Sequence, residues 1–254
     1  MTQSLEGTVA LVTGASSGIG EATAVALAEE GAAVAVVARR LDRLEALAER
    51  IGSSGGKALV IEADVTDLAQ AQRAVETTVA ELGRLDTLVN NAGVMLLGPL
   101  VGAPIEEWQQ MVHLNLLGLL YCTHAALPHL LSAAAAQPRE VADVVNVSSV
   151  AGRVARRNSG VYNATKFGVG AFSESLRQEV ATRHVRVTII EPGATSTELA
   201  SHNRPEILQE ISANFGGIAR LESDDIANSV RYAVTQPRHV AVNEILIRPT
   251  EQER

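Results

Sequence analysis

The fold is decided by one stretch near the N-terminus, Val9-Ala-Leu-Val-Thr13-Gly14-Ala-Ser16-Ser17-Gly18-Ile19-Gly20. Its short apolar run predicts a buried strand, which leads into three glycines and then into a helical pattern ending at Gly31. Glycines let the backbone approach a phosphate closely, and the start of a helix supplies aligned N–H groups. The Gly-x3-Gly-x-Gly spacing would also suit a plain strand-to-helix turn. The strand-glycine-helix context favours pyrophosphate binding by Gly14, Ser16, Ser17, Gly18, Ile19 and Gly20.

The rest of the chain continues this alternation of apolar runs and amphipathic stretches. Further strands are expected over residues 33–38, 58–63, 85–90, 141–148, 185–191 and 244–247. Further helices are expected over residues 41–51, 68–82, 105–131, 159–184 and 224–234. This order predicts an α/β fold, a single doubly wound parallel sheet of the Rossmann type with helices on both faces.

No repeat or linker divides the chain, so residues 1–254 are expected to form one domain. Two irregular segments interrupt the pattern. Residues 132–140 are predicted to form a surface loop. Residues 194–220 follow the end of a strand and are a candidate lid over a binding crevice.

Composition excludes several classes of protein. The net charge of −8 argues against a nucleic-acid or anionic-membrane surface, and no apolar stretch reaches the length of a membrane span. A single cysteine, Cys122, rules out an internal disulfide and fits a reducing compartment. With no signal segment visible, a cytoplasmic location is expected. The six histidines show no metal-ligand spacing, so no metal is expected.

The residues that follow the second expected strand indicate which cofactor, NAD(H) or NADP(H), the site prefers. Residues 33–38 are followed by Arg39 and Arg40, and no acid occurs before Asp42. An NAD site usually places an acid there to bind the ribose 2′-hydroxyl, whereas arginine suits a 2′-phosphate. NADP(H) is therefore favoured over NAD(H). An exposed, arginine-rich helix start is the alternative, and it explains Arg40 better than Arg39.

Tyr162 and Lys166 stand four residues apart on an expected helix, so they share a face. The chain has only two lysines, Lys57 and Lys166, against 19 arginines. A nearby cation stabilises phenolate and lowers the pKa of tyrosine. The pair is therefore a candidate general acid/base.

These motifs together resemble the classical short-chain dehydrogenase/reductase family over nearly the whole length of the chain. The matching residues occur in the family's order: Thr13-Gly14, Gly18-Ile19-Gly20, Asp64-Val65, Asn90-Asn91-Ala92-Gly93, Asn115, Ser149, Tyr162, Lys166 and Pro192-Gly193 with Thr197. The resemblance implies that Tyr162 transfers a proton to or from a carbonyl oxygen that Ser149 polarises. It implies that Lys166 lowers the tyrosine pKa and binds the cofactor ribose. Asn115 would hold a proton relay; a helix asparagine bonding a backbone carbonyl is the alternative.

The resemblance also implies the remaining cofactor contacts. They are Asp64, Val65, Asn91, Ala92, Gly93, Pro192, Gly193, Thr195 and Thr197, beside Tyr162 and Lys166. For Asp64 and the asparagine–glycine stretch, a plain turn is the alternative reading. The expected function is NADP(H)-dependent reduction of a small aldehyde or ketone to an alcohol, or the reverse. A non-catalytic NADP(H)-sensing protein and an epimerase acting through transient oxidation are the alternatives.

Two stretches resemble particular branches of the family. Residues 242–250 resemble the serine and 3-hydroxy acid dehydrogenases, and residues 95–99 resemble clavulanate dehydrogenases. Arg153, Arg156 and Arg157 fall between Ser149 and Tyr162, a segment that borders the substrate pocket in the family that the chain resembles. Met95, Ser149, Arg153 and Arg156 are candidate substrate contacts, and the three arginines could select a carboxylate-bearing substrate. A solvated or inter-subunit run of charge is the alternative.

The resemblance implies a homotetramer, paired partly through the expected helix over residues 159–184. Small residues recur on one face of this helix, at Ala164, Gly168, Ala171 and Ser175. Packing of this face against the chain's own sheet is the alternative.

Overall fold

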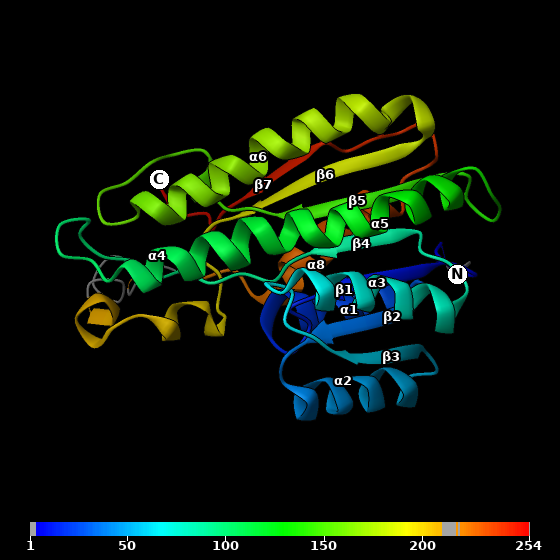
Figure 1. Cartoon of the computed structure of the whole chain (residues 1–254), viewed down its shortest axis with the longest axis horizontal. Coiled ribbons are helices and arrows are strands. Elements are labelled where there is room, and N and C mark those ends of the chain that lie inside the picture. Colours follow the sequence, from blue (N-terminus) through cyan, green and yellow to red (C-terminus); the bar gives the residue numbers. More distant parts are fainter. Residues whose placement is uncertain (1–3, 210–216, 218, 254) are drawn as a thin grey trace.

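The computed structural model describes residues 4–209, 217 and 219–253. In this part of the chain, parallel strands form one seven-stranded sheet in the order β3-β2-β1-β4-β5-β6-β7 (Figure 1). The strands are β1 Val9–Thr13, β2 Ala33–Ala38, β3 Lys57–Glu62, β4 Thr87–Asn90, β5 Ala142–Val147, β6 Val185–Pro192 and β7 Glu244–Ile247. The predicted doubly wound parallel sheet is confirmed.

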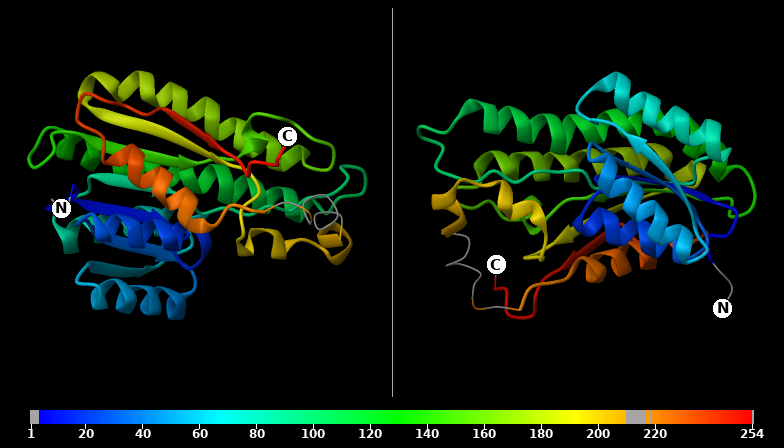
Figure 2. Two further views of the ribbon diagram at one scale, coloured as in Figure 1. Left: turned by 180° about the vertical axis from the view of Figure 1, so that it is seen from behind. Right: turned by 90° about the horizontal axis from the view of Figure 1, so that it is seen from below.

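Helices cover both faces of this sheet (Figures 1 and 2). One face carries α1 Gly18–Glu29, α2 Leu41–Ser53 and α8 Ser223–Val234. The other carries α3 Leu68–Leu82, α5 Leu119–Ala134 and α6 Gly160–Val180. Helix α4, Ile105–Val112, continues into α5 through a π-helical segment, η1 His113–Gly118. Short 3-10 turns are η2 Val150–Gly152, η3 Ala181–Arg183 and η4 Glu198–His202.

The strands bury both of their faces because successive side chains point to opposite sides of the sheet. In β1, Ala10 and Val12 join the core under α1, α2 and α8. Leu11, between them, joins the core under α3, α5 and α6. The near-continuous apolar strands in the sequence follow from this double burial.

The boundaries differ from the prediction at a few helix and strand ends. The helix predicted to end at residue 131 continues to Ala134, so the predicted 132–140 loop begins as helix. Alanine favours helix strongly, which accounts for the extension through Ala133 and Ala134. The strand predicted over residues 85–90 begins at Thr87 instead.

The helical segment Ile105–Ala134 corrects another expectation. It is 30 residues long, and an 18-residue window within it has a mean hydropathy of 1.3, so by length and composition alone it could cross a membrane. A core helix passes the same test. Cys122, Ala126 and Leu130 of α5 are buried against the sheet, so we interpret the segment as a core helix.

The sheet reverses its strand order between β1 and β4, and ligands of open α/β sheets bind beyond the carboxyl ends of the strands at such a point. The chain from η4 through the helical residues 205–209 projects from this edge (gold in Figure 1). Residues 210–216 and 218 of the predicted lid lie outside the described residues.

Candidate active site

A cavity of about 460 Å³ lies at this carboxyl edge. Most of the predicted site residues line it: Gly14, Ser16, Ser17, Gly18, Ile19, Arg39, Arg40, Asp64, Val65, Asn91, Ala92, Gly93, Met95, Ser149, Arg156, Tyr162, Lys166, Pro192, Gly193, Thr195 and Thr197. Gly20, Asn115 and Arg153 are not among its lining residues. One cavity thus brings together residues from both halves of the chain.

The glycines of the turn expose backbone at one wall of the cavity. Gly14 and Gly18 have φ angles of +66° and +59°, a region that favours glycine. A Cβ on Gly20 would lie 2.4 Å from both Asn91 Nδ2 and the Gly14 oxygen. The Asn91 amide donates to the oxygen of Thr13 at 3.0 Å, so the loop after β4 holds the turn in place.

Helix α1 starts at this turn, and the Ser17 side chain makes no capping hydrogen bond to it. The first backbone N–H groups of a helix have no partner within the helix, which makes its N-terminus suited to anions. A turn with three glycines beside such a helix start fits the pyrophosphate of a dinucleotide.

The two arginines after β2 have different surroundings. Arg40 donates to the Ser16 hydroxyl from Nε and Nη2, at 3.1 and 3.0 Å, and to the Ser17 hydroxyl at 2.7 Å. Its Nη1 pairs with Glu198 at 2.8 Å. Arg39 is 70% exposed and reaches Asp64 at 4.0 Å. Arg40 is therefore the guanidinium built into the glycine turn, while Arg39, the other predicted cofactor contact, lines the cavity with an exposed side chain.

At the other end of the cavity, α6 places Tyr162 and Lys166 on one buried face. Lys166 Nζ donates to the Val147 oxygen at 2.8 Å and lies 5.8 Å from the centre of the Tyr162 ring. The Tyr162 hydroxyl is hydrogen-bonded to Ser149. The Ser149 hydroxyl also accepts from the Ala151 N–H at 3.0 Å, which fixes its position at the start of η2.

Burial controls the titration of this pair. It raises the pKa of Tyr162 to about 12, although the hydrogen bond with Ser149 acts in the opposite direction. It lowers the pKa of Lys166 to about 8. The sequence predicted that Lys166 would lower the pKa of Tyr162, and that prediction is not met in this structure. Desolvation of the phenolate outweighs the stabilising contacts.

Asn115 lies behind the cavity wall, within the π-helical segment η1. Its Oδ1 accepts from the Val94 N–H, and its Nδ2 donates to the Val94 oxygen, both at 2.8 Å. Nδ2 also lies 3.2 Å from the Thr165 hydroxyl on α6. The side chain therefore joins the loop after β4 to the helix that carries Tyr162. The alternative to a proton relay was an asparagine that hydrogen-bonds a backbone carbonyl, and the bond from Nδ2 to the Val94 oxygen is of this kind.

The two arginines predicted to contact the substrate, Arg153 and Arg156, lie in different surroundings. Arg153 donates to Glu191 at 2.7 and 2.8 Å and pairs with Glu244, which ties η2 to β6 and β7 away from the cavity. These pairs raise the pKa of the Arg153 guanidinium. The structure thus gives Arg153 a structural role in place of the predicted substrate contact. Arg156 does line the cavity, as Met95 does.

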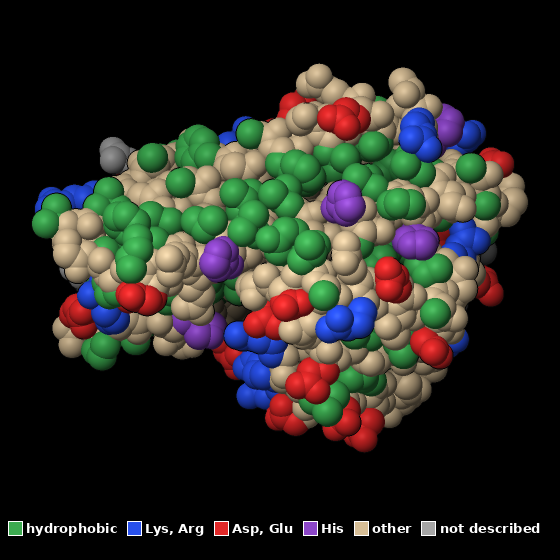
Figure 3. All heavy atoms as spheres, in the orientation of Figure 1, with side chains coloured by type: hydrophobic (Ala, Val, Ile, Leu, Met, Phe, Trp, Pro, Cys, Tyr) green, Lys and Arg blue, Asp and Glu red, His purple; other side chains and the backbone are tan. Residues whose placement is uncertain are grey.

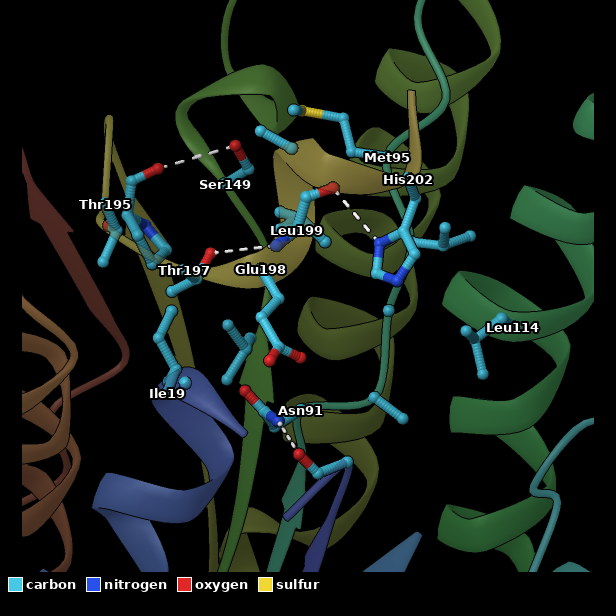
Figure 4. Close-up of a pocket in the computed structure, with 18 of the residues that line it drawn as sticks. Ile19, Asn91, Met95, Leu114, Ser149, Thr195, Thr197, Glu198, Leu199 and His202 are labelled. Atoms are coloured by element: carbon cyan, nitrogen blue, oxygen red, sulfur yellow. Dashed lines mark hydrogen bonds between the residues drawn. The ribbon is translucent and has the colours of Figure 1, made fainter. Parts of the chain in front are cut away.

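Several residues at the cavity were not singled out in the sequence, although most of them lie within the predicted 194–220 lid. Glu198, Leu199 and His202 of η4 line the cavity (Figure 4). Arg220 and Gln252 line it as well. Two further side chains hold its walls. Asn203 accepts from the Leu97 N–H at 2.7 Å and donates to the Met95 oxygen at 2.8 Å. Asn163 donates to the Ala151 oxygen at 2.7 Å. Asn163 lies inside the Tyr-x-x-x-Lys motif, so its neighbours could have drawn attention to it.

No group of three or more His, Cys, Asp or Glu residues in the described ranges could hold a metal ion. Cys122 is buried in α5, and burial raises the pKa of its thiol to about 12.

Known proteins resemble this chain in sequence. A family model described as short chain dehydrogenase matches residues 8–208. The glycine betaine reductase of Emericella nidulans is 43% identical over 98% of this chain, which spans only 19% of that enzyme. An oxidoreductase of Staphylococcus saprophyticus, described as uncharacterized, is 38% identical over 96% of both chains.

Solved structures resemble it as well. The closed form of a serine dehydrogenase complexed with NADP+ matches with a TM-score of 0.88 and 30% identity over 97% of each chain. An alcohol dehydrogenase from the archaeon Thermococcus sibiricus, complexed with 5-hydroxy-NADP, matches with a TM-score of 0.84 and 28% identity, over 97% of this chain and 98% of that one. Sequence match, fold and cavity residues agree, and the chain belongs to the short-chain dehydrogenase family of oxidoreductases.

Proposed function

We propose that this protein is an NADP(H)-dependent oxidoreductase that reduces a small aldehyde or ketone to an alcohol, or catalyses the reverse oxidation. One observation carries the proposal: the glycine turn with Arg40 shares a cavity with the hydrogen-bonded Tyr162 and Ser149. The neighbours solved with NADP+ and 5-hydroxy-NADP support the cofactor.

We assign the following binding and catalytic roles to residues of this chain. The backbone from Gly14 to Gly20 would hold the pyrophosphate and Arg40 the 2′-phosphate, since arginine matches phosphate geometry. When bound, NADP(H) supplies or accepts the hydride. Tyr162, whose pKa burial raises to about 12, would donate its proton to the carbonyl oxygen. Ser149 would hydrogen-bond the same oxygen, and the Lys166 ammonium would stabilise the phenolate formed.

Replacing Tyr162 by phenylalanine tests the assignment. Tyr162→Phe removes only the hydroxyl, so kcat should fall by about 10²–10⁴-fold, the range for losing a general acid. The dissociation constant of NADPH, measured by fluorescence, should change little. A variant that keeps its turnover, or one that loses NADPH binding as well, would contradict the role of Tyr162. A panel of carbonyl compounds assayed with NADPH and with NADH would identify both substrate and cofactor preference.

We propose further that the substrate carries a carboxylate. Arg156 and Arg220 line the cavity, whereas its lining acids within the described residues are Asp64 and Glu198. Both of these acids contact arginines that follow β2. The electrostatic potential near Arg156 and Arg220 therefore favours an anionic substrate.

The matched test compares two neighbouring arginines. Arg156→Ala should lower kcat/KM for carboxylate-bearing aldehydes about tenfold or more relative to neutral ones, as expected when a charge-assisted pair is lost. Arg157→Ala is the control, because Arg157 is exposed and does not line the cavity. An equal loss for both substrate classes would argue for a structural role of Arg156.

We propose that the protein assembles into a homotetramer. Ala164, Ala171 and Ser175 on α6 are exposed, so packing against the chain's own sheet does not explain this small-residue face. Phe167, on the same helix, is 44% exposed. Figure 3 shows hydrophobic side chains gathered over α5 and α6, and large apolar surfaces mark protein interfaces. Light scattering on the eluting protein would measure the mass; a monomer would refute the assembly.

A further inference from the structure

The Glu198 carboxylate lies on the guanidinium that we assign to the cofactor phosphate. It accepts from Arg40 Nη1 at 2.8 Å and from the Ser17 hydroxyl, and Arg43 Nη2 lies 3.9 Å away. The hydrogen bond from Arg40 lowers the pKa of Glu198, so the group is an anion at neutral pH. A carboxylate thus occupies a cluster of one hydroxyl and two guanidinium groups, the donor set that suits a phosphate monoester.

The partner of Arg40 comes from a distant part of the chain. Glu198 is the first residue of η4, which follows β6 and Thr197, whereas Arg40 follows β2. Thr197 packs over the glycine turn: a Cβ on Gly18 would lie 3.2 Å from its Cγ2. Glu198 therefore extends across the turn to reach Arg40, and Figure 4 shows its side chain pointing into the cavity.

We propose that Glu198 is an internal competitor for the 2′-phosphate of NADP(H), and so a residue that sets the affinity for the phosphorylated cofactor. Arg40 already donates from Nε and Nη2 to Ser16 and Ser17, which leaves the Nη1 side, where Glu198 sits, for an incoming phosphate. Two anions on one guanidinium repel each other, so the phosphate must displace the carboxylate. A cofactor that lacks the 2′-phosphate can bind without displacing the Glu198 carboxylate.

The inference rests on the proposed function, because it assumes that Arg40 binds the 2′-phosphate.

The test measures binding without turnover, with adenosine 2′,5′-bisphosphate and adenosine 5′-diphosphate as probes. Glu198→Gln removes the charge and keeps the size of the side chain. It should tighten binding of the 2′,5′-bisphosphate by about fivefold, the upper end for a half-exposed ion pair, and leave the 5′-diphosphate unchanged. Glu45→Gln, an exposed change of equal charge on α2, should alter neither.

Adding Arg40→Gln to both wild type and Glu198→Gln completes a double-mutant cycle. Without Arg40, the effect of Glu198→Gln should vanish. If Glu198→Gln tightens both probes equally, or weakens the bisphosphate, the competitor role is overturned while the proposed function stands. If wild type binds neither the bisphosphate nor NADPH, the proposed cofactor site itself fails.

Discussion

Lys166 offers the sharpest physical test of the site, because burial should make the stability of the fold depend on its proton. Lys166 is 6% exposed, and its pKa is lowered from 10.5 to about 8. The folded protein therefore releases this proton near pH 8, whereas the unfolded chain keeps it until about pH 10.5. Between these values the unfolded state binds more protons, so stability contributed by this residue rises with pH.

The magnitude follows from the two pKa values. Each unit of difference corresponds to about 1.4 kcal/mol, so the contribution of Lys166 should rise by about 2 kcal/mol between pH 7.5 and 9.5. Lys166→Met keeps the length of the side chain but has no proton to lose. The free energy of unfolding should be measured in urea for both proteins at the two pH values. The difference, wild type minus Lys166→Met, should be about 2 kcal/mol larger at pH 9.5 than at pH 7.5.

Other groups that titrate in the interval are present in both proteins, so their effects cancel in the difference. The chain supplies its own control: Lys57, its only other lysine, is exposed at the start of β3. Lys57→Met should differ from wild type by a constant amount at the two pH values. A constant difference for Lys166→Met as well would refute the reasoning, because Lys166 would then keep its proton throughout.

Two further substitutions probe the walls of the cavity. Gly20→Ala places a Cβ 2.4 Å from Asn91 Nδ2, so urea denaturation should show a loss of about 1–3 kcal/mol and NADPH should bind more weakly. Gly170→Ala, a helical glycine with nothing within 4 Å of the new atom, should cause neither loss and is the control. Asn203→Ala removes two hydrogen bonds to the loop beside Met95 and should raise KM for the carbonyl substrate about tenfold without changing the Kd of NADPH. Asn228→Ala, on the exposed face of α8, should leave both constants unchanged.

Two outcomes would contradict these expectations. Equal stability of the two glycine variants would mean that the turn can move away from the new atom at no cost. A parallel loss of NADPH binding in Asn203→Ala would show that the loop beside Met95 also shapes the cofactor end.

The sequence determined the parts of this protein that depend on short separations along the chain. A strand followed by Gly14 and Gly20 predicts the glycine turn, because the turn and the helix start are local structures. The spacing of Tyr162 and Lys166 predicts a shared helix face for the same reason. The alternation of apolar runs predicts the parallel sheet, and family resemblance adds Ser149, which the structure brings into hydrogen-bond contact with Tyr162.

Tertiary structure decided what depends on distant neighbours. Arg153 and Arg156 look alike in the sequence, yet only Arg156 lines the cavity, because β6 and β7 bring glutamates to Arg153. Arg40 and Glu198 are 158 positions apart, and no local pattern connects them. The pKa values of Tyr162 and Lys166 moved opposite to the simple expectation for an ion-stabilised phenol, because desolvation depends on everything packed around a group. Local structure depends on residues that are close together in the sequence, so the sequence alone can predict it. Burial and charge pairing depend on residues far apart in the sequence, so they are established only when the whole chain has folded.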